Sequence, residues 1–233
     1  MTHHILKFII GAILGSFFHV IAICMPIKAN WFTRRSACPR CARKLKTLEL
    51  IPILSFLTLK GRCLGCRAKI SPIYFWCELI SGILFLMAPN TFEASVLVSL
   101  MLLVTLTDIY YQVVPNKTLI LFGTILWLAG GNFLGGVAGF AIMSAISGIG
   151  WLLWRKATLG AGDIKLYFVI GLILPIPALF LSIFFASAFA LAYIIITCHP
   201  KQTPLPFAPF ISIGVYISYL WSAPIISWYL FLI

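Results

Sequence analysis

Aspartate occurs only twice in the 233-residue chain, and both copies adjoin apolar stretches. Asp108 stands in Leu106-Thr107-Asp108-Ile109, and Asp163 stands in Gly160-Ala161-Gly162-Asp163-Ile164-Lys165. A charge at the centre of a membrane helix costs roughly 2.5 to 3.5 kcal/mol on insertion scales, so two such residues in an acid-poor chain indicate a function. Two carboxylates that share a site cannot both ionise easily, which leaves one acid and one base around a water molecule. The pair therefore predicts aspartic peptide hydrolysis.

The composition predicts an all-α polytopic membrane protein. The chain is 62% hydrophobic and 9% charged, with a mean hydropathy of +1.08, which leaves too little polar surface for a water-soluble globule. A bilayer core takes about 20 apolar residues per helix, and the chain holds about eight such segments. They run over residues 5–25, 73–88, 94–113, 118–129, 134–154, 166–174, 177–197 and 210–231.

The basic residues predict how the chain crosses the membrane. With eight spans and both termini outside, every basic residue except Lys7 falls on the cytoplasmic face, as the positive-inside rule requires. The net charge of +12 is thus a sign of topology, and we do not expect a nucleic-acid partner. The first span has no small-residue cleavage site after it, so we expect a retained helix. Asp108 and Asp163 then lie at one depth near the cytosol, where they can meet.

The segment 26–72 differs from the rest, because it holds 11 basic residues against one acid, Glu49. Within it lie two Cys-x-x-Cys pairs, Cys38/Cys41 and Cys63/Cys66. Two such pairs complete a closed tetrahedral zinc site, and a reducing cytosol disfavours the alternative of two disulfides. Four protein ligands leave no position for substrate, so we expect a structural zinc ion that folds a cytoplasmic loop. The isolated Cys24, Cys77 and Cys198 are interpreted as packing residues.

Several motifs of the chain stand in the same order and spacing as the motifs of a known protein family. They are Gly11-x-x-x-Gly15-Ser16-Phe17 with Pro26, the paired Cys-x-x-Cys motifs, Glu49-Leu50-Ile51-Pro52-Ile53-Leu54-Ser55, Gly61-Arg62-Cys63, Ile70-Ser71 with Tyr74 and Glu78, Asp108 with Val114-Pro115-Asn116, Gly160-Ala161-Gly162-Asp163-Ile164-Lys165, and Pro206-Phe207-Ala208-Pro209-Phe210. On these residues the chain resembles the type IV prepilin peptidases, intramembrane aspartic peptidases of the Gly-x-Gly-Asp type, over nearly its whole length.

The resemblance implies a function for each part of the chain. Asp108 and Asp163 would be the catalytic pair, and the substrate would be a prepilin of a type IV pilus or a pseudopilin of type II secretion, cleaved at the cytoplasmic boundary of the bacterial inner membrane. Many relatives also methylate the new amino terminus with S-adenosylmethionine. The domains would be a first membrane helix (1–25), a zinc-binding loop with a possible methyltransferase role (26–72) and a seven-helix peptidase domain (73–233).

The chain departs from the family's pattern around the methyltransferase region. His19 and Cys24 stand where relatives commonly carry Asn and Arg, and Ile73 replaces a common Arg. Glu49 and Glu78 are the acids available for a cofactor site there, although an acid in an interfacial loop is also ordinary solvated surface. A peptidase without methyl transfer is therefore an alternative.

Two other classes of function remain open from the residues alone. An acid pair in a membrane protein also suits a carrier that binds cations or relays protons, although both acids lie at one surface and no internal repeat is visible. A scaffold whose zinc loop docks a cytosolic partner would use the aspartates only for packing. Replacement of either aspartate by asparagine separates these classes, since only a peptidase would lose leader cleavage.

Overall fold

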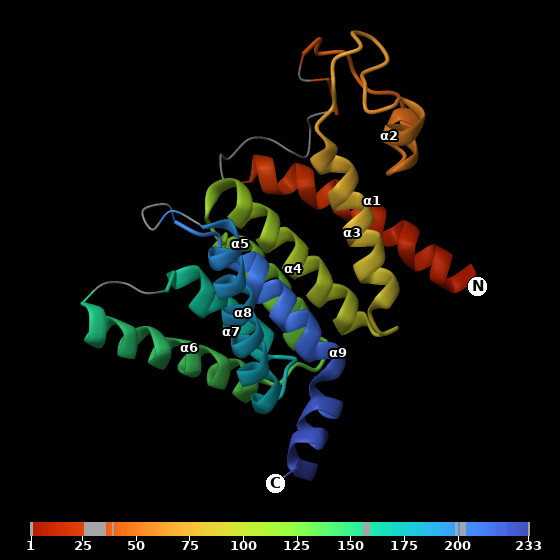
Figure 1. Ribbon diagram of the computed structural model, residues 1–233. Coiled ribbons are helices and arrows are strands. Elements are labelled where there is room, and N and C mark those ends of the chain that lie inside the picture. Colours follow the sequence, from red (N-terminus) through yellow and green to blue (C-terminus); the bar gives the residue numbers. More distant parts are fainter. Residues whose placement is uncertain are drawn as a thin grey trace. The chain divides into compact units, whose positions relative to one another are not determined.

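The computed structural model describes residues 2–25, 36–38, 40–155, 159–198, 200 and 204–232. These residues are largely helical and contain no β-strand, apart from two isolated antiparallel bridges (Figure 1). The chain forms two compact units, Met1–Pro89 and Asn90–Ile233. The predicted all-α fold is confirmed.

Each predicted span corresponds to a helix. These are α1 (Thr2–Cys24), α3 (Pro72–Met87), α4 (Phe92–Tyr111), α5 (Asn116–Leu128), α6 (Phe133–Trp154), α7 (Ala161–Gly171), α8 (Ile176–Thr197) and α9 (Ala208–Leu232). Among the described residues, five helices are long and apolar enough to cross a membrane, namely α1, α4, α6, α8 and α9, while α3 and α5 are shorter apolar helices. The protein is therefore a multi-helix membrane protein.

The sixth predicted segment shows the largest difference in bounds. We expected it over residues 166–174, but α7 begins at Ala161. Hydropathy misses the start of this helix because its first turn contains a glycine, Gly162, and a carboxylate, Asp163, and follows another glycine at the N-cap, Gly160. The earlier start matters because it places Asp163 on the helix instead of before it.

The first unit is built on the close pairing of α1 and α3. A Cβ on Gly11 would lie 2.7 Å from the Phe85 Cβ, and a Cβ on Gly15 would lie 2.6 Å from the Ser81 Cβ, so glycine is needed at both positions. The Ser81 hydroxyl also donates to the Gly11 carbonyl oxygen at 2.5 Å. Small residues four apart that let two backbones approach are typical of helix pairs in membranes.

The predicted cytoplasmic loop connects α1 to α3. It contains a 3₁₀ helix, η1 (Thr47–Leu50), and a short helix, α2 (Leu54–Thr58), neither of which was predicted. Residues 26–35 and 39 of this loop lie outside the described residues, as do Lys156 and Lys201 of the topology prediction. The compact units divide after Pro89, whereas the predicted division after residue 72 concerns function and stays a prediction.

The second unit packs its helices through small and hydroxyl residues. The helices α6 and α7 approach so closely that a Cβ on Gly139 would lie 2.3 Å from the Tyr167 carbonyl oxygen. Between α4 and α9, the Thr105 hydroxyl donates to the Ser212 hydroxyl at 2.8 Å. The α4–α9 contacts bring the last turn of α4 and the first residues of α9 together. The helix α5 packs against both α4 and α7.

Candidate active site and metal centre

Asp108 lies in the last turn of α4 and is buried. Its Oδ2 atom accepts the backbone N–H of Ala208, the first residue of α9, at 2.8 Å. The first N–H groups of a helix have no partner within the helix, so a carboxylate is a favourable acceptor at this end. The start of α9 therefore fixes the position of the Asp108 carboxylate.

Asp163 lies in the first turn of α7 and is half-buried. Its backbone N–H donates to the Gly160 carbonyl oxygen at 3.1 Å, which closes the first turn. A Cβ on Gly160 would lie only 3.3 Å from the Asp163 Oδ2 atom, so the side chain folds over this glycine. Gly160 thus leaves room for the Asp163 carboxylate.

The segment that follows α4 contacts the first turn of α7. A Cβ on Gly162 would lie 2.9 Å from the Val114 Cβ, and the Lys165 ammonium donates to the Asn116 side-chain oxygen at 3.1 Å. The Val-Pro-Asn motif and the Gly-x-Gly-Asp-x-Lys motif therefore contact each other. These contacts join the segment that follows Asp108 to the turn that carries Asp163.

Two residues of the second unit complete this region although no role was predicted for them. They are Ala208, through its backbone N–H, and Asn116, through its side chain. Both belong to motifs that the sequence singled out, Pro206-Phe207-Ala208-Pro209-Phe210 and Val114-Pro115-Asn116. A backbone donor leaves no trace in residue type, so only the fold identifies the part that Ala208 plays.

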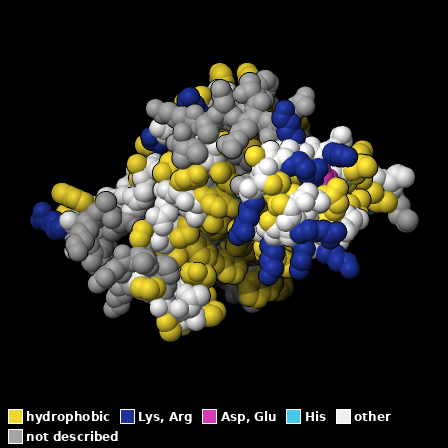
Figure 2. All heavy atoms as spheres, turned by 90° about the horizontal axis from the view of Figure 1, so that it is seen from above, with side chains coloured by type: hydrophobic (Ala, Val, Ile, Leu, Met, Phe, Trp, Pro, Cys, Tyr) yellow, Lys and Arg dark blue, Asp and Glu magenta, His cyan; other side chains and the backbone are white. Residues whose placement is uncertain are grey.

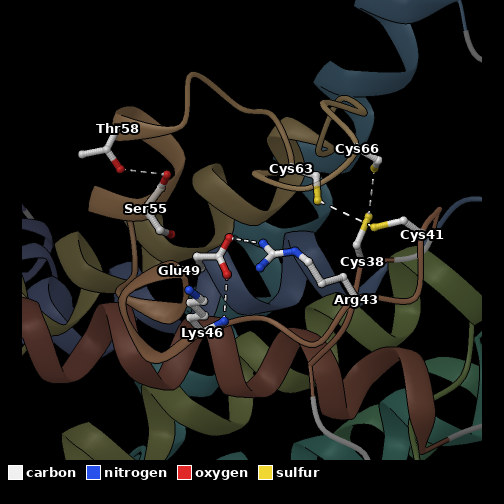
Figure 3. A network of polar contacts seen from close by, with 9 residues as sticks. All are labelled: Cys38, Cys41, Arg43, Lys46, Glu49, Ser55, Thr58, Cys63 and Cys66. Atoms are coloured by element: carbon white, nitrogen blue, oxygen red, sulfur yellow. Dashed lines mark hydrogen bonds and ion pairs between the residues drawn. The ribbon is translucent and has the colours of Figure 1, made fainter.

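The four cysteines of the loop form one cluster. The four sulfur atoms all lie within 4.8 Å of one another, and they belong to Cys38, Cys41, Cys63 and Cys66. Figure 3 shows the four side chains directed toward one another. The Cys38 and Cys66 sulfurs are 3.8 Å apart, and those of Cys41 and Cys63 are 4.0 Å apart. Zinc–sulfur bonds of about 2.3 Å imply edges of about 3.8 Å in a tetrahedron, so the cluster fits a zinc ion.

The two halves of the cluster are built alike. In the first, the Cys38 N–H donates to the Arg43 carbonyl oxygen at 3.0 Å and the Ala42 N–H donates to Cys38 at 2.9 Å. The same two bonds recur 25 residues later, from Cys63 to Ala68 and from Arg67 to Cys63, at 2.9 and 3.0 Å. Each half also carries one antiparallel bridge, and each turns through a residue with positive φ, Ala42 or Arg67.

The turns also prepare the sulfur atoms for a cation. The backbone N–H groups of Cys66 and Gly65 lower the pKa of Cys63 to about 6. The Arg43 N–H lowers the pKa of Cys41, but hydrogen bonds with the other thiols, first with Cys66, raise it overall to about 11. Neighbouring thiols cannot all ionise without a positive charge between them, which is the charge that a metal ion supplies.

Glu49 is occupied by contacts within the loop. Its carboxylate accepts the Lys46 backbone N–H at 2.8 Å and pairs with the Arg43 guanidinium (Figure 3). The Lys46 N–H, followed by Arg43, holds the pKa of Glu49 below its ordinary value. Because Arg43 lies two residues after Cys41, this ion pair joins η1 to the cysteine cluster.

Glu78 lies on α3, where it is buried, and it holds an unusual turn. Its Oε2 atom accepts the Ile53 backbone N–H at 2.7 Å. Ile53 has a φ of 64° and a ψ of −54°, and the Leu54 N–H donates across it to the Pro52 carbonyl oxygen at 2.6 Å, which defines a γ-turn. Such a conformation costs a branched residue on the order of 1–3 kcal/mol, so the carboxylate stabilises a strained segment.

Both acids of the first unit line one cavity of about 840 Å³ between the loop and the ends of α1 and α3. Its wall also includes Tyr74, Phe56 and Cys24. Glu78 forms no ion pair with any residue in the described part of the chain, whereas Glu49 is paired with Arg43. The volume suits a drug-sized molecule, and Glu78 is the carboxylate that remains for a cationic ligand.

The three departures from the family pattern lie around this cavity or near it. His19 is buried on α1 and stacks on Tyr74, with the ring centroids 4.2 Å apart. Cys24 lines the cavity directly. Ile73 lies at the start of α3, where its backbone N–H donates to the Ser71 hydroxyl at 3.4 Å.

The fold and these sites together indicate the class of membrane protein to which the chain belongs. It is a multi-helix membrane protein with two aspartates at neighbouring helix ends in one unit, and with a four-cysteine loop and an acid-lined cavity in the other.

Comparisons with known proteins identify the family. Residues 9–92 match the Bacterial Peptidase A24 N-terminal domain, and residues 95–195 match the Type IV leader peptidase family. The chain is 37% identical to a prepilin leader peptidase/N-methyltransferase of Bacillus subtilis (strain 168), over 96% of each chain. It therefore belongs to the prepilin leader peptidase/N-methyltransferase family.

Two further relatives agree. A protein of the same name from Aeromonas salmonicida (strain A449) is 30% identical over 97% of this chain and 93% of its own. The type 4 prepilin-like proteins leader peptide-processing enzyme of Escherichia coli O78:H11 is 30% identical over 88% of each chain. No solved structure matches the chain.

Proposed function

We propose that this protein cleaves the leader from type IV prepilins or pseudopilins and then methylates the new amino terminus. The carrier and scaffold alternatives do not account for the family match. For cleavage, the observation that supports the proposal is the contact between the segment after Asp108 and the first turn of α7, which carries Asp163, through Val114 against Gly162 and Asn116 against Lys165. Aspartic peptidases need two carboxylates that share a proton and a water molecule.

The chemistry follows from the proton that the pair holds. The ionised carboxylate takes a proton from the water as it attacks the scissile carbonyl carbon, while the protonated partner donates a hydrogen bond to the carbonyl oxygen. The proton then passes to the leaving amine, so the pair returns to its starting state. Because the two groups are coupled, the proton belongs to the pair and not to one residue.

The substrate is a prepilin or pseudopilin with a short basic leader before a long apolar helix, as in the family. Its helix would lie in the bilayer and its leader in the cytosol, so the bond after the leader reaches the cytoplasmic boundary. The positive-inside distribution of basic residues supports this depth for Asp108 and Asp163, in a multi-pass protein of the bacterial inner membrane with both termini outside.

Co-expression with a candidate prepilin tests the peptidase. Asp108→Asn and Asp163→Asn should each abolish leader cleavage on a gel while the protein still inserts. Glu93→Gln is the matched control, because it removes a carboxylate from the first turn of the same helix, α4, at the end away from Asp108. Cleavage by either asparagine variant at the wild-type rate would rule out the proposed pair.

For methyl transfer, we assign the methyl donor to the cavity of the first unit. S-adenosylmethionine is a sulfonium cation, and carboxylates and aromatic faces are the groups that bind such cations. Glu78 would bind the sulfonium end and Tyr74 would provide an aromatic face, while Glu49 keeps its structural partners. When bound, the donor supplies the methyl group, and the cavity's role is to hold it beside the new amine.

A binding experiment tests this assignment separately from activity. Glu78→Gln should weaken binding of S-adenosylmethionine by calorimetry, whereas Glu93→Gln should not, and both should still cleave prepilin. Mass spectrometry of the processed pilin then gives the methylation state. An unmodified amino terminus with the wild-type protein would identify a peptidase only, the alternative that His19, Cys24 and Ile73 leave open.

Zinc is assigned a structural role. The four cysteines would bind it through their sulfur atoms, with no position left for substrate. The two halves of the loop that carry the cysteines meet at the cluster, so the metal would supply part of the folding energy of the loop.

A further inference from the structure

Five leucines of the loop are exposed although the loop is otherwise highly charged, and the three most exposed lie on its two short helices. Leu48 on η1 is 78% exposed, and Leu54 and Leu57 on α2 are 59% and 57% exposed. We call these three residues the leucine patch. Residues 54 and 57 are three apart on a helix and thus share one side of it, and η1 packs against α2. Single exposed leucines are ordinary, but a group of them marks an interaction surface.

The patch is not the side of α2 that folds the loop. The other side of α2 carries Phe56, whose ring lies 5.4 Å from that of Phe75, and Ser55 and Leu59, which line the cavity. A Cβ on Gly61 would lie 2.9 Å from the Phe56 ring, so this ring is covered by the chain. The inward contacts of α2 are therefore made without the leucine patch, which is left exposed to a partner outside the first unit.

The charges around the patch indicate the occupant. Lys46 directly precedes η1 and Lys60 follows α2 by two residues, and both side chains are exposed. Residues 36–71 hold eight basic residues and one acid, Glu49, which Arg43 neutralises. Figure 2, which views the molecule from the side of the loop, shows Lys and Arg side chains gathered beside apolar ones. Leucines bracketed by lysines are typical of segments that lie in the surface of an anionic membrane.

The connections of the loop keep it at the membrane. The chain enters it from α1 and leaves it into α3, and both are apolar helices of the first unit. Only 13 residues separate Thr58, the end of α2, from Pro72, the start of α3. A segment held this closely to a membrane helix meets the bilayer surface before any free partner.

We propose that the leucine patch docks onto the cytoplasmic surface of the membrane, with Leu48, Leu54 and Leu57 in the headgroup region and Lys46 and Lys60 on anionic lipid headgroups. This contact orients the loop, and with it the cysteine cluster, relative to the bilayer. It does not depend on the proposed chemistry at Asp108, Asp163 or Glu78.

Photocrosslinking of the full chain in lipid nanodiscs tests the proposal. The crosslinking residue p-benzoylphenylalanine is placed at Leu57, which faces outward, and at the adjacent Phe56, which faces inward as the matched control. Discs contain phosphatidylcholine alone or with phosphatidylglycerol. We expect lipid adducts at position 57 and peptide adducts within residues 1–89 at position 56. The zinc content of each variant shows whether the loop is folded.

The anionic part of the proposal has its own measurement. Each basic residue near an anionic surface changes its occupancy roughly fivefold, so Lys46→Gln with Lys60→Gln should lower the lipid adduct at position 57 in mixed discs toward the yield in neutral discs. Equal yields in both kinds of disc for the unaltered lysines would overturn the role of the charges. A crosslink from position 57 to residues 90–233, or to added pilin in place of lipid, would overturn membrane docking itself.

Discussion

A backbone N–H, and not a cation, is the hydrogen-bond donor to the Asp108 carboxylate among the described residues. Among the described residues, no lysine or arginine forms an ion pair with Asp108 or Asp163, and Lys165 is turned to Asn116 instead. A guanidinium or ammonium group beside the pair would favour ionisation of both carboxylates and remove the shared proton. No such cation pairs with Asp108 or Asp163 in the described residues, which is compatible with the shared proton that the proposed hydrolysis requires.

The hydrogen bond from the Ala208 N–H to Asp108 can be tested by a single substitution. Ala208→Pro keeps a residue suited to a helix start but removes the donor to Asp108, and the ring occupies the donor's place. Hydrogen bonds to charged groups contribute about 1.5–3 kcal/mol, so we expect leader cleavage to slow roughly 10- to 100-fold. Ala208→Gly retains the N–H and is the control. An unchanged cleavage rate in the proline variant would show that this bond does not position Asp108.

The glycine beside Asp163 provides a second prediction. Gly162→Ala places a Cβ 2.9 Å from the Val114 Cβ, so α7 or the segment after α4 must shift. We expect slower cleavage in a time course with purified substrate. Val114→Gly removes the opposing atom, and the double variant should therefore recover part of the lost rate. A double variant no faster than Gly162→Ala would indicate that the glycine serves another purpose.

Residue types alone predicted which side chains form each candidate site, but not the contacts that position those side chains. The rarity of aspartate predicted Asp108 and Asp163, and the Cys-x-x-Cys spacing predicted the cysteine cluster. Ile53 was unpredictable, because its strained turn is stabilised by Glu78, which lies 25 residues away in sequence. Whether Asp108 and Asp163 act together, and whether the cysteines bind zinc, stay predictions.

A close helix pair that depends on glycine positions the helix of Asp163 in the second unit. The α6–α7 pair is the clearest case, since Gly135, Gly139 and Gly171 each have a backbone oxygen of the partner helix 2.3 Å from the place of a Cβ. In a membrane, where lipid is as apolar as a side chain, such close backbone packing replaces the hydrophobic effect as the main attraction between helices. Because α7 carries Asp163, its distance from α6 also sets the site.

The same helix, α6, offers an experiment with an internal control. Gly139→Ala requires the backbones of α6 and α7 to separate, whereas a Cβ on Gly148 meets nothing within 4 Å. Overpacking of this kind costs about 1–3 kcal/mol, so Gly139→Ala should lower the unfolding temperature in detergent while Gly148→Ala should not. If both variants unfolded at the wild-type temperature, α6 and α7 would not be in close contact.

The cysteine loop makes a prediction about an element that depends on metal. Cys38→Ser should release zinc and expose the loop to proteolysis, since three sulfur ligands hold the ion less well and the loop folds with it. Cys198→Ser is the control, because Cys198 is exposed and outside the cluster. Metal analysis and limited proteolysis measure the two effects. Full zinc occupancy in the Cys38 variant would refute the four-sulfur site.

Hydropathy predicted the long elements well and the short ones poorly. All eight segments became helices, because each is apolar over two turns or more. The start of α7 and the helices η1 and α2 were missed, since a carboxylate lowers the hydropathy of a first turn and an apolar stretch of four or five helical residues is too short to show a helical period. These missed pieces carry Asp163 and the leucine patch, so the local exceptions to the apolar pattern are where the candidate functions lie.

At the scale of the whole molecule, the two candidate chemistries occupy separate compact units. The aspartates belong to residues 90–233, and the cysteine cluster and the acid-lined cavity belong to residues 1–89. The two family matches divide the chain in nearly the same place, at 9–92 and 95–195. Methylation requires a free amino terminus, so in the proposed assignment cleavage at the aspartates of one unit would precede methyl transfer at the cavity of the other.

This division predicts that the two activities can be supplied by different molecules. Asp163→Asn should block cleavage but keep the methyl-donor cavity, and Glu78→Gln should cleave but methylate poorly. When both variants share one liposome with prepilin, we expect cleaved and methylated pilin, because the pilin released by one molecule can diffuse in the bilayer to the other. Mass spectrometry of the pilin amino terminus measures the yield, and liposomes that contain either variant alone are the controls. Cleaved but unmethylated pilin from the mixture would mean that the substrate passes between the units of a single molecule without release.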